Sequence, residues 1–314
     1  MRPFAVTIIT MLAFASPAGG QCPASGTPAA SMPELARRIA DRVALVAGAE
    51  FALSYRDLGT SDSLDIGSDV SFHAASTMKI PVMIEVLRAA ESGRLSLDQP
   101  ILLVNRFHSI VDGSPYSLDA GVDSDSSAYA RIGERVPVRE LLERMIVRSS
   151  NLATNALIAL VGAHRVEAVA HELGATRMRV LRGVEDGKAY AAGLNNTTTS
   201  RDLAMLLLRI ERGDALSPAH ARLVREILLR QEWNDEIPAG VPTGTPVAHK
   251  TGSITATLHD AAIVYPAAGA PYVLVVLTRR IPDEAVARSL IVDLSRLVWS
   301  VSSRRRCAAT ASGR

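Results

Sequence analysis

The chain has 314 residues, of which 48% are hydrophobic and 21% charged, a composition that fits an ordinary globular protein with a sizeable core. Its formal net charge is only +2, and no basic stretch is interleaved with aromatic residues, so the sequence argues against a nucleic-acid partner. This length fits one or two domains.

The N-terminus has the pattern of a signal peptide. Arg2 precedes an apolar run over 4–14, and small residues follow it. The run is too short to cross a membrane, and no later segment is long enough. We therefore expect residues 1–20 to be removed, no stable membrane span, and a periplasmic or secreted mature protein. Gln21, in place of a small residue before Cys22, disfavours a lipid anchor.

The chain holds two cysteines, Cys22 and Cys307, one near each end. Export to an oxidising compartment permits them to pair if the termini meet. Two unpaired terminal thiols fit the sequence equally well, so both alternatives stay open.

The first third of the chain predicts two helices separated by two strands. Apolar spacing and turn residues place a helix at 33–49, strands at 51–57 and 63–66 around a turn at 57–60, and a buried helix from Ser76 to Ser92 that stops at Gly93.

The middle of the chain is mainly helical. Residues 105–135 are rich in Ser, Asp and Gly and predict a long irregular excursion, and 177–199 is also expected to be irregular. Helical periods recur at 138–148, 151–162, 164–173, 200–212 and 217–230.

The last third changes character, with strand-like runs at 245–251, 258–265 and 271–279 before a closing helix at 283–302. Strands near both ends with helices between them predict an α+β fold. We expect a discontinuous α/β domain, 33–72 and 214–303, and an inserted helical domain, 73–213.

Ser76-Thr77-Met78-Lys79 places a hydroxyl and an amine three residues apart at the predicted start of a helix, hence on one face. The helix N-terminus adds partial positive charge that stabilises an oxyanion there. A serine becomes a strong nucleophile when a base removes its proton, and a partly desolvated lysine can be that base. Ordinary composition gives about one Ser-x-x-Lys in a chain this long, so alone the motif predicts only a solvated pair.

Lys250-Thr251-Gly252 lies in the first strand-like run of the last third and arises by chance in roughly one chain in twenty. Its lysine offers a positive charge to a carboxylate, its threonine a hydroxyl, and its glycine room for a ligand. An edge strand with an exposed lysine is the alternative.

Ser149-Ser150-Asn151 lies between two predicted helices, where a hydroxyl and a carboxamide can point into a cleft. Helix capping alone also explains these residue types, because Ser and Asn are favoured N-caps.

In order and spacing, these motifs resemble the Ser-x-x-Lys, Ser-Asp-Asn and Lys-Thr-Gly set of class A β-lactamases and penicillin-binding proteins. Asn-Leu-Ala-Thr-Asn at 151–155, Asn-Thr-Thr-Thr at 196–199 and the closing helix extend the resemblance over about 33–303. It implies a β-lactamase/transpeptidase-like α+β fold, with an antiparallel sheet flanked by N- and C-terminal helices and an inserted all-helical domain.

The resemblance implies that Ser76 attacks a β-lactam or acyl-D-alanine carbonyl, with Lys79 as base or proton shuttle and Ser149 relaying a proton to the leaving nitrogen. The implied substrate contacts are Asn151 with the side-chain amide, Lys250 and Thr251 with the carboxylate, and the backbone amides of Ser76 and Ser253 as the oxyanion hole.

The sequence departs from the family pattern at three places. Ser150 replaces the middle Asp of Ser-Asp-Asn, and the excursion that carries Tyr116 is longer than in typical class A enzymes. The third departure lies in the loop whose Glu-x-x-Leu-Asn motif holds the deacylating water.

In that loop, Arg182-Gly183-Val184-Glu185-Asp186 is followed by Leu-Asn only at 194–195. We expect Glu185 to be the deacylation base, with Asp186 as second candidate and Asn195 as the water's other partner. Two solvated loop acids are the alternative.

Neighbouring His259 and Asp260 point to opposite faces of a strand, so they do not form a catalytic pair. We expect His259 to be buried and hydrogen-bonded, and Arg279 or Arg280 to supply a carboxylate-binding cation. No two of the seven histidines have zinc-site spacing, so we expect neither a metal nor a cofactor.

Three functions compete: a β-lactamase that turns over through an acyl-enzyme, a penicillin-binding D,D-peptidase or esterase with slow deacylation, and a non-catalytic protein that retains the fold. The full set of acylation residues disfavours the last, and Glu185 favours the first. We predict a monomeric serine β-lactamase whose partner is a β-lactam or peptidoglycan-like small molecule.

Overall fold

The computed structural model describes residues 31–312, with side chains described up to Ser303. The expected signal peptide and Cys22 lie outside the described residues, as does the side chain of Cys307. Signal cleavage and the disulfide therefore stay predictions.

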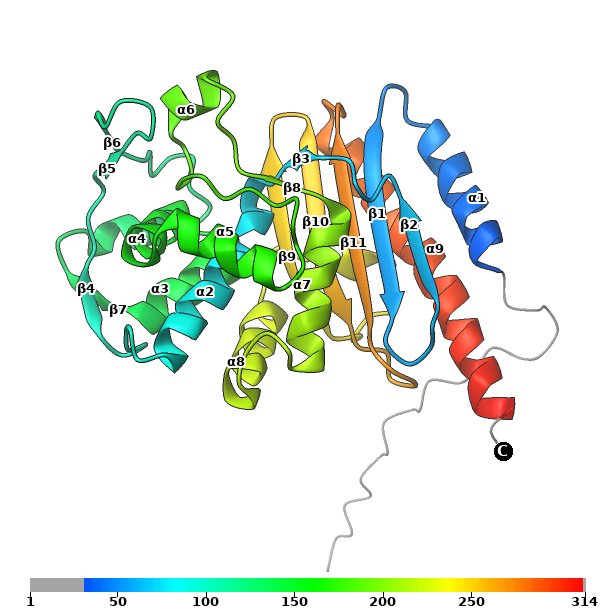
Figure 1. The fold of residues 1–314 in the computed structure, drawn as a ribbon. Helices are drawn as coiled ribbons and strands as arrows, with labels where there is room; N and C mark the ends of the chain where they lie inside the picture. The colour runs from blue at the N-terminus through cyan, green and yellow to red at the C-terminus, as the bar shows by residue number, and fades with distance from the viewer. Residues whose placement is uncertain (1–30, 313–314) are drawn as a thin grey trace, which may run out of the picture.

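A five-stranded antiparallel sheet forms the centre of the molecule, in the order β2-β1-β11-β10-β9 (Figure 1). The strands come from both ends of the chain: β1 Glu50–Asp57, β2 Ser63–Ile66, β9 Val247–Ile254, β10 Thr257–Val264 and β11 Tyr272–Arg279. Strands β10 and β11 are buried over nearly their whole length, because helices cover both faces of the sheet. The predicted α+β class is confirmed.

Two helices cover one face of the sheet, α1 (Met32–Ala44) and α9 (Glu284–Ser312) (Figure 1). The Ser31 hydroxyl accepts a hydrogen bond from the Glu34 amide, and Pro33 fits the first turn, so α1 begins where its capping residues predict. It ends before the predicted residue 49, and α9 continues past the predicted residue 302.

The other face packs against α7 (Ser200–Arg212) and α8 (Pro218–Leu229). Beyond them lie the remaining long helices, α2 (Lys79–Glu91), α3 (Val138–Val147), α4 (Asn151–Val161) and α5 (Ala163–Glu172) (Figure 1). Apolar residues of all six helices share one core with this sheet face. The domain boundaries proposed at 73 and 213 stay a prediction.

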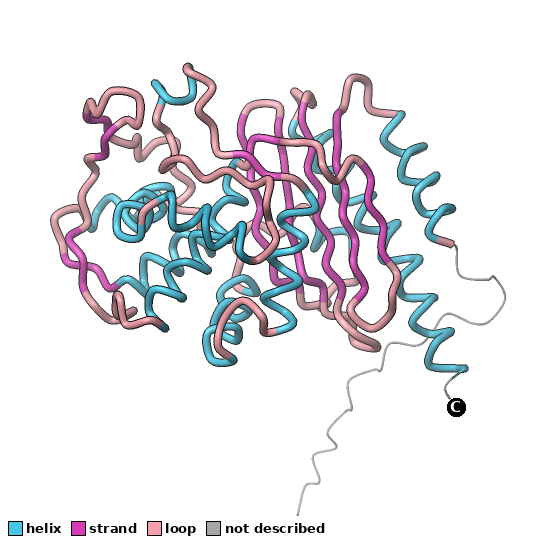
Figure 2. The backbone as a smooth tube through the Cα atoms, in the orientation of Figure 1, coloured by secondary structure: helices cyan, strands magenta, loops and turns pink. Residues whose placement is uncertain are grey.

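Short elements depart from the sequence prediction. The expected helix from Ser76 is a 3₁₀ turn, η1 (Ala75–Met78), followed by α2. Both segments expected to be irregular contain brief regular pieces, which are too short to carry a hydrophobic period (Figure 2). They include β5 (Phe107–His108), β6 (Pro115–Tyr116), η2 (Ser126–Arg131), β7 (Arg135–Pro137), α6 (Gly187–Ala191) and β8 (Thr197–Thr198). The other short elements are β3 (Phe72–His73), β4 (Pro100–Leu102) and η3 (Ile237–Gly240).

Within residues 31–312, no single helix has the length and apolar character to cross a membrane, although α4 and α5, bent by 83° at their junction, pass that test together.

Candidate active site

Ser76 lies in η1, in a turn that hydrogen bonds hold in an uncommon backbone conformation. The preceding residue, Ala75, has φ 46°, which a non-glycine residue rarely adopts. Its amide donates to His73 Nδ1 at 3.0 Å, and the Thr77 hydroxyl donates to the Ala74 carbonyl at 2.5 Å. The surrounding structure thus fixes the direction in which Ser76 is presented.

Strand β9 lies directly against this turn at Gly252. A Cβ atom at position 252 would lie 3.0 Å from the Ser76 amide nitrogen and 3.1 Å from that of Thr77. Only glycine therefore permits this approach without a backbone shift. The exposed Ser253 follows Gly252 on the same strand; its amide as part of the oxyanion hole stays a prediction.

Lys79 is fully buried at the start of α2, one turn after Ser76. Its Nζ donates to the carbonyl of Ser149 at 2.5 Å and to the side chains of Ser149 (Oγ, 3.1 Å) and Asn151 (Oδ1, 2.9 Å). Burial holds the pKa of Lys79 well below its usual range, and the positive charge of Lys250 lowers it further. Asp123 and Glu185 act in the opposite direction. A lysine in this setting can accept a proton.

Ser149 and Asn151 flank the residue that caps α4. The buried Ser150 accepts a hydrogen bond from the Ala153 amide through its hydroxyl, at 3.3 Å. Ser149 itself has φ 61°, and this left-handed residue turns the chain so that its hydroxyl faces Lys79.

Glu185 joins the same group of residues through Asn151, whose Nδ2 donates to Glu185 Oε1 at 2.5 Å. Asn151 thus links Lys79 to Glu185. Burial raises the pKa of the Glu185 carboxyl; the Asn151 hydrogen bond opposes this shift, and the charge of Asp123 adds to it. Asn155 fixes the approach of the loop, because it accepts from the Val184 amide at 2.6 Å and donates to the Val184 carbonyl at 3.0 Å.

The other two candidate residues of the loop that carries Glu185, Asn195 and Asp186, have different surroundings. Asn195, which we paired with Glu185, instead accepts from Arg182 Nη2 at 3.0 Å. The Asp186 carboxylate is buried and accepts from the Ala189 amide, the Ser109 hydroxyl and the Ile110 amide at 2.9–3.0 Å. Asp186 is therefore engaged as the N-cap of α6 and by Ser109 and Ile110, which disfavours it as an alternative base.

Lys250 and Thr251 precede Gly252 on β9. The buried Lys250 Nζ donates to the Thr251 carbonyl at 3.0 Å. Burial lowers the pKa of Lys250 to about 7, although Asp260 and Glu236 favour its charged form. An incoming carboxylate would reinforce that charge.

The proposed additional cations are engaged elsewhere. Arg279 donates to Glu50 Oε2 at 2.6 Å, and Arg280 pairs with Glu50 at 2.6 Å. Neither contacts Lys250 or Thr251 within the described part of the chain.

His259 is buried, as predicted, and it contacts His73, the residue that holds the Ser76 turn. Its Nε2 donates to the His73 carbonyl at 2.9 Å, and its Nδ1 accepts from the Thr278 amide at 3.2 Å. Burial lowers the pKa of His259 to about 4, which keeps this ring neutral. Sequence reasoning did not connect His259 with Ser76, because His259 reaches this turn through His73, 186 positions away in the chain.

Among residues 31–303, no group of three or more His, Cys, Asp or Glu side chains is arranged to hold a metal ion.

Comparison with known proteins assigns the family. Residues 34–301 match the model of the Beta-lactamase enzyme family. The chain belongs to this family. A curated member, a β-lactamase of Streptomyces albus G, is 28% identical over 94% of this chain and 91% of its own length.

Two solved structures have a similar fold. PBP-A aligns with a TM-score of 0.75 at 28% identity, covering 88% of this chain and 99% of its own. A β-lactamase from Sphaerobacter thermophilus aligns with a TM-score of 0.73 at 26% identity, covering 87% and 98%.

Proposed function

We propose that this family member is a serine β-lactamase that acylates at Ser76 and deacylates through Glu185. The observation that carries the proposal is the continuous set of hydrogen bonds from Ser149 through Lys79 and Asn151 to Glu185, which brings two candidate bases into one site. Both bases carry pKa shifts toward the neutral range, the lysine downward and the carboxyl upward.

In acylation, neutral Lys79 accepts the Ser76 proton while Ser76 Oγ bonds to the β-lactam carbonyl carbon. The amides of Ser76 and Ser253 stabilise the oxyanion. The ring C–N bond then breaks, and the proton passes from Lys79 through Ser149 to the departing nitrogen. The contact of Lys79 Nζ with Ser149 Oγ, at 3.1 Å, provides this route.

In deacylation, Glu185 accepts a proton from a water molecule whose oxygen bonds to the acyl carbon. The ester bond to Ser76 breaks, and the same proton returns to Ser76 Oγ, so the enzyme is regenerated and the product is the ring-opened acid. The raised pKa of Glu185 strengthens it as a base near neutral pH. A mutant of the neighbour PBP-A was solved as an acyl-enzyme complex with penicillin G, which supports β-lactam acylation in this fold.

The test follows adduct and turnover separately. Purified protein is mixed with a chromogenic cephalosporin, and hydrolysis is recorded beside the intact mass. We expect Ser76→Ala to form no adduct, and Glu185→Gln to acylate and then stall, with turnover reduced by roughly 100-fold or more. An adduct on Ser76→Ala would overturn the nucleophile assignment.

The parent chain decides between the two acylating functions. Sustained turnover supports the β-lactamase. A persistent adduct on the parent would indicate a penicillin-binding peptidase or esterase instead, and full turnover by Glu185→Gln would leave Lys79 as the remaining base.

A further inference from the structure

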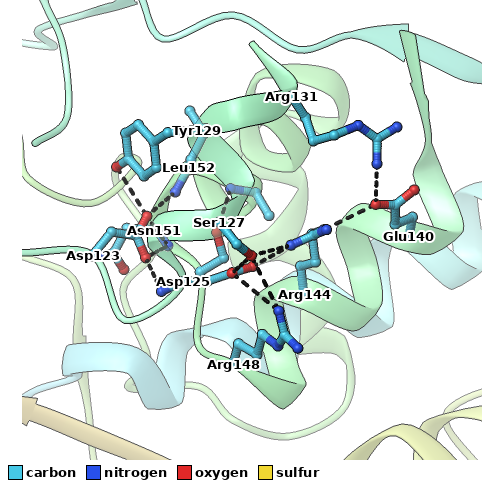
Figure 3. A network of polar contacts seen from close by, with 12 residues as sticks. Asp123, Asp125, Ser127, Tyr129, Arg131, Glu140, Arg144, Arg148, Asn151 and Leu152 are labelled. Atoms are coloured by element: carbon cyan, nitrogen blue, oxygen red, sulfur yellow. Dashed lines mark hydrogen bonds and ion pairs between the residues drawn. The ribbon is translucent and has the colours of Figure 1, made fainter. Parts of the chain in front are cut away.

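The buried carboxylate of Asp123, from the excursion at 105–135, lies at the N-terminus of α4 (Figure 3). Both oxygens of Asp123 accept from the Asn151 amide at 3.0 Å, and Oδ2 also accepts from the Leu152 amide at 3.0 Å. The Tyr129 hydroxyl and the Asp125 amide donate to the same carboxylate at 3.1 and 3.0 Å. Asp123 therefore neutralises the end of the helix from which Asn151 projects.

The segment that carries Asp123 is anchored on its other side to α3. Asp125, also buried, pairs with Arg144 at 2.9 Å and with Arg148 at 3.6 Å (Figure 3). Glu140 forms ion pairs with both Arg144, at 3.0 Å, and Arg131, at 2.8 Å. These ion pairs hold the loop between two helices, so that the position of Asp123 is set by the fold.

The motif Ser149-Ser150-Asn151 contains no acid, and Ser150 uses its hydroxyl on Ala153. We propose that Asp123 is a positioning residue of the acylation site: it supplies from the loop the negative charge that this motif lacks and fixes Asn151 between Lys79 and Glu185. This inference rests on the proposed function, because it concerns the same site.

The charge of Asp123 acts on both bases in the same direction. Lys79 is faced by Lys250, Asp123 and Glu185. Glu185 is faced by Asp123, Lys79 and Asp119. A negative charge raises the pKa of every neighbouring group, so its removal lowers the pKa of Lys79 and of Glu185 together.

The test is Asp123→Asn, which keeps the shape of the side chain and removes its charge. The rate constants for acylation by a chromogenic cephalosporin and for deacylation are each measured by stopped flow as a function of pH, because Lys79 sets the ascending limb of the first profile and Glu185 that of the second. We expect both limbs to move to lower pH by about 1 unit, and the plateau rate constant for acylation to fall roughly tenfold because Lys79 becomes a weaker base and Asn151 is less firmly held.

Asp125→Asn is the matched control. It removes a second buried acid two residues away, whose partners are Arg144 on α3 and Arg148 just after it rather than the amides of α4. We expect it to lower the melting temperature while both limbs stay in place, because Asp123 keeps its charge and its hydrogen bonds to the Asn151 and Leu152 amides.

Unchanged limbs in Asp123→Asn, with only a loss of melting temperature like that of Asp125→Asn, would overturn the proposal and leave Asp123 as a purely structural cap. If Asp123→Asn is too unstable for kinetics, Asp123→Glu keeps the charge, and we expect parental limbs with slower acylation; displaced limbs in this variant would refute the inference. A parent chain that forms no adduct refutes the proposed function instead, so the two failures are distinguishable.

Discussion

Two lysines of the site are buried, and burial lowers the pKa of both. Their tasks nevertheless differ because their partners differ. Lys79 meets a hydroxyl and a carboxamide, the groups of a proton relay. Lys250 meets the carbonyl of Thr251 and lies beside the nucleophile turn, where a substrate anion would complete its charge pairing.

For Lys250 we expect a pH-dependent preference for substrates that carry a free carboxylate. With a pKa of about 7, Lys250 is charged below that pH and neutral above it, so the preference for an acid over its methyl ester should decline as the pH rises through 7. Lys250→Ala should cost the acid about 1.5–3 kcal/mol, roughly 10- to 160-fold in kcat/KM, and the ester far less. Steady-state kinetics on an acid and ester pair check this; equal losses for the two substrates would contradict it.

Spacing within a motif predicted which residue types carry the chemistry, because neighbours along a helix or strand keep fixed relations. The supporting residues come from distant parts of the chain. Asp123, Asn155 and His259 act through contacts across 28, 29 and 186 positions, and no local pattern marks such pairs. Glu185 likewise contacts a distant residue, Asn151, 34 positions away, whereas Asn195, the expected second partner of the deacylating water, accepts from Arg182.

The hairpin β5–β6 and the segment that carries Glu185 form one polar assembly above the helices (Figure 1). Asp186 binds Ser109 and Ile110 of the hairpin, and the Tyr116 hydroxyl donates to the Val184 carbonyl at 3.2 Å. The excursion that is longer than in typical class A sequences thus braces the loop that carries the expected base. Sequence composition predicted an irregular segment here, but not its partner, because two-residue strands leave no period.

We expect Asp186→Asn to slow deacylation about 3- to 10-fold and to leave acylation unchanged. The amide keeps one acceptor and turns its other end into a donor, which faces the Ile110 amide or the Ser109 hydroxyl, so the Glu185 loop loosens. Single-turnover acylation and decay of the acyl-enzyme mass separate the two steps.

Asp112→Asn is the control for this change. Asp112 lies on the same hairpin and forms an exposed ion pair with Lys188 of α6, which this change removes. An exposed pair contributes little to stability. Equal effects of Asp186→Asn on acylation and deacylation would show that the hairpin acts on the whole site and not on the Glu185 loop.

Within residues 31–303, the sheet separates two apolar cores, one shared with the helices that carry the site and one beneath α1 and α9. This architecture was predictable from the long segments with a hydrophobic period, because each helix and strand must bury one face. Buried charges were not predictable in the same way. Asp260 accepts from His249 at 3.0 Å and from the Ile237 amide at 3.0 Å, between the sheet and η3.

Glu236 lies next to this pair and has a buried carboxylate oxygen, Oε2, without a hydrogen-bond donor among the described residues. It is 4% exposed, and Oε1 lies 3.5 Å from Arg288 Nε. Burial raises the pKa of Glu236 to about 7, and the charge of Asp260 adds to the shift.

We expect this acid to make the protein less stable at alkaline pH. A group whose pKa rises on folding, here from 4.5 to about 7, contributes stability that is complete below the lower value and is lost as the pH rises through the upper one. The loss corresponds to roughly 1–3 kcal/mol. Glu236→Gln is neutral at every pH, so it should raise the melting temperature at about pH 8 and change it little at about pH 4.5.

Glu284→Gln is the matched control for thermal unfolding, because Glu284 pairs with the same Arg288 from an exposed position. We expect it to lower the melting temperature slightly and equally at both pH values, since exposed pairs contribute little. Equal shifts at both pH values for Glu236→Gln would mean that the Glu236 carboxyl stays charged in the folded protein, held by Arg288. A gain confined to alkaline pH would instead locate the limit on stability in one buried carboxyl beside Asp260 of β10, on the side of the sheet that α9 covers.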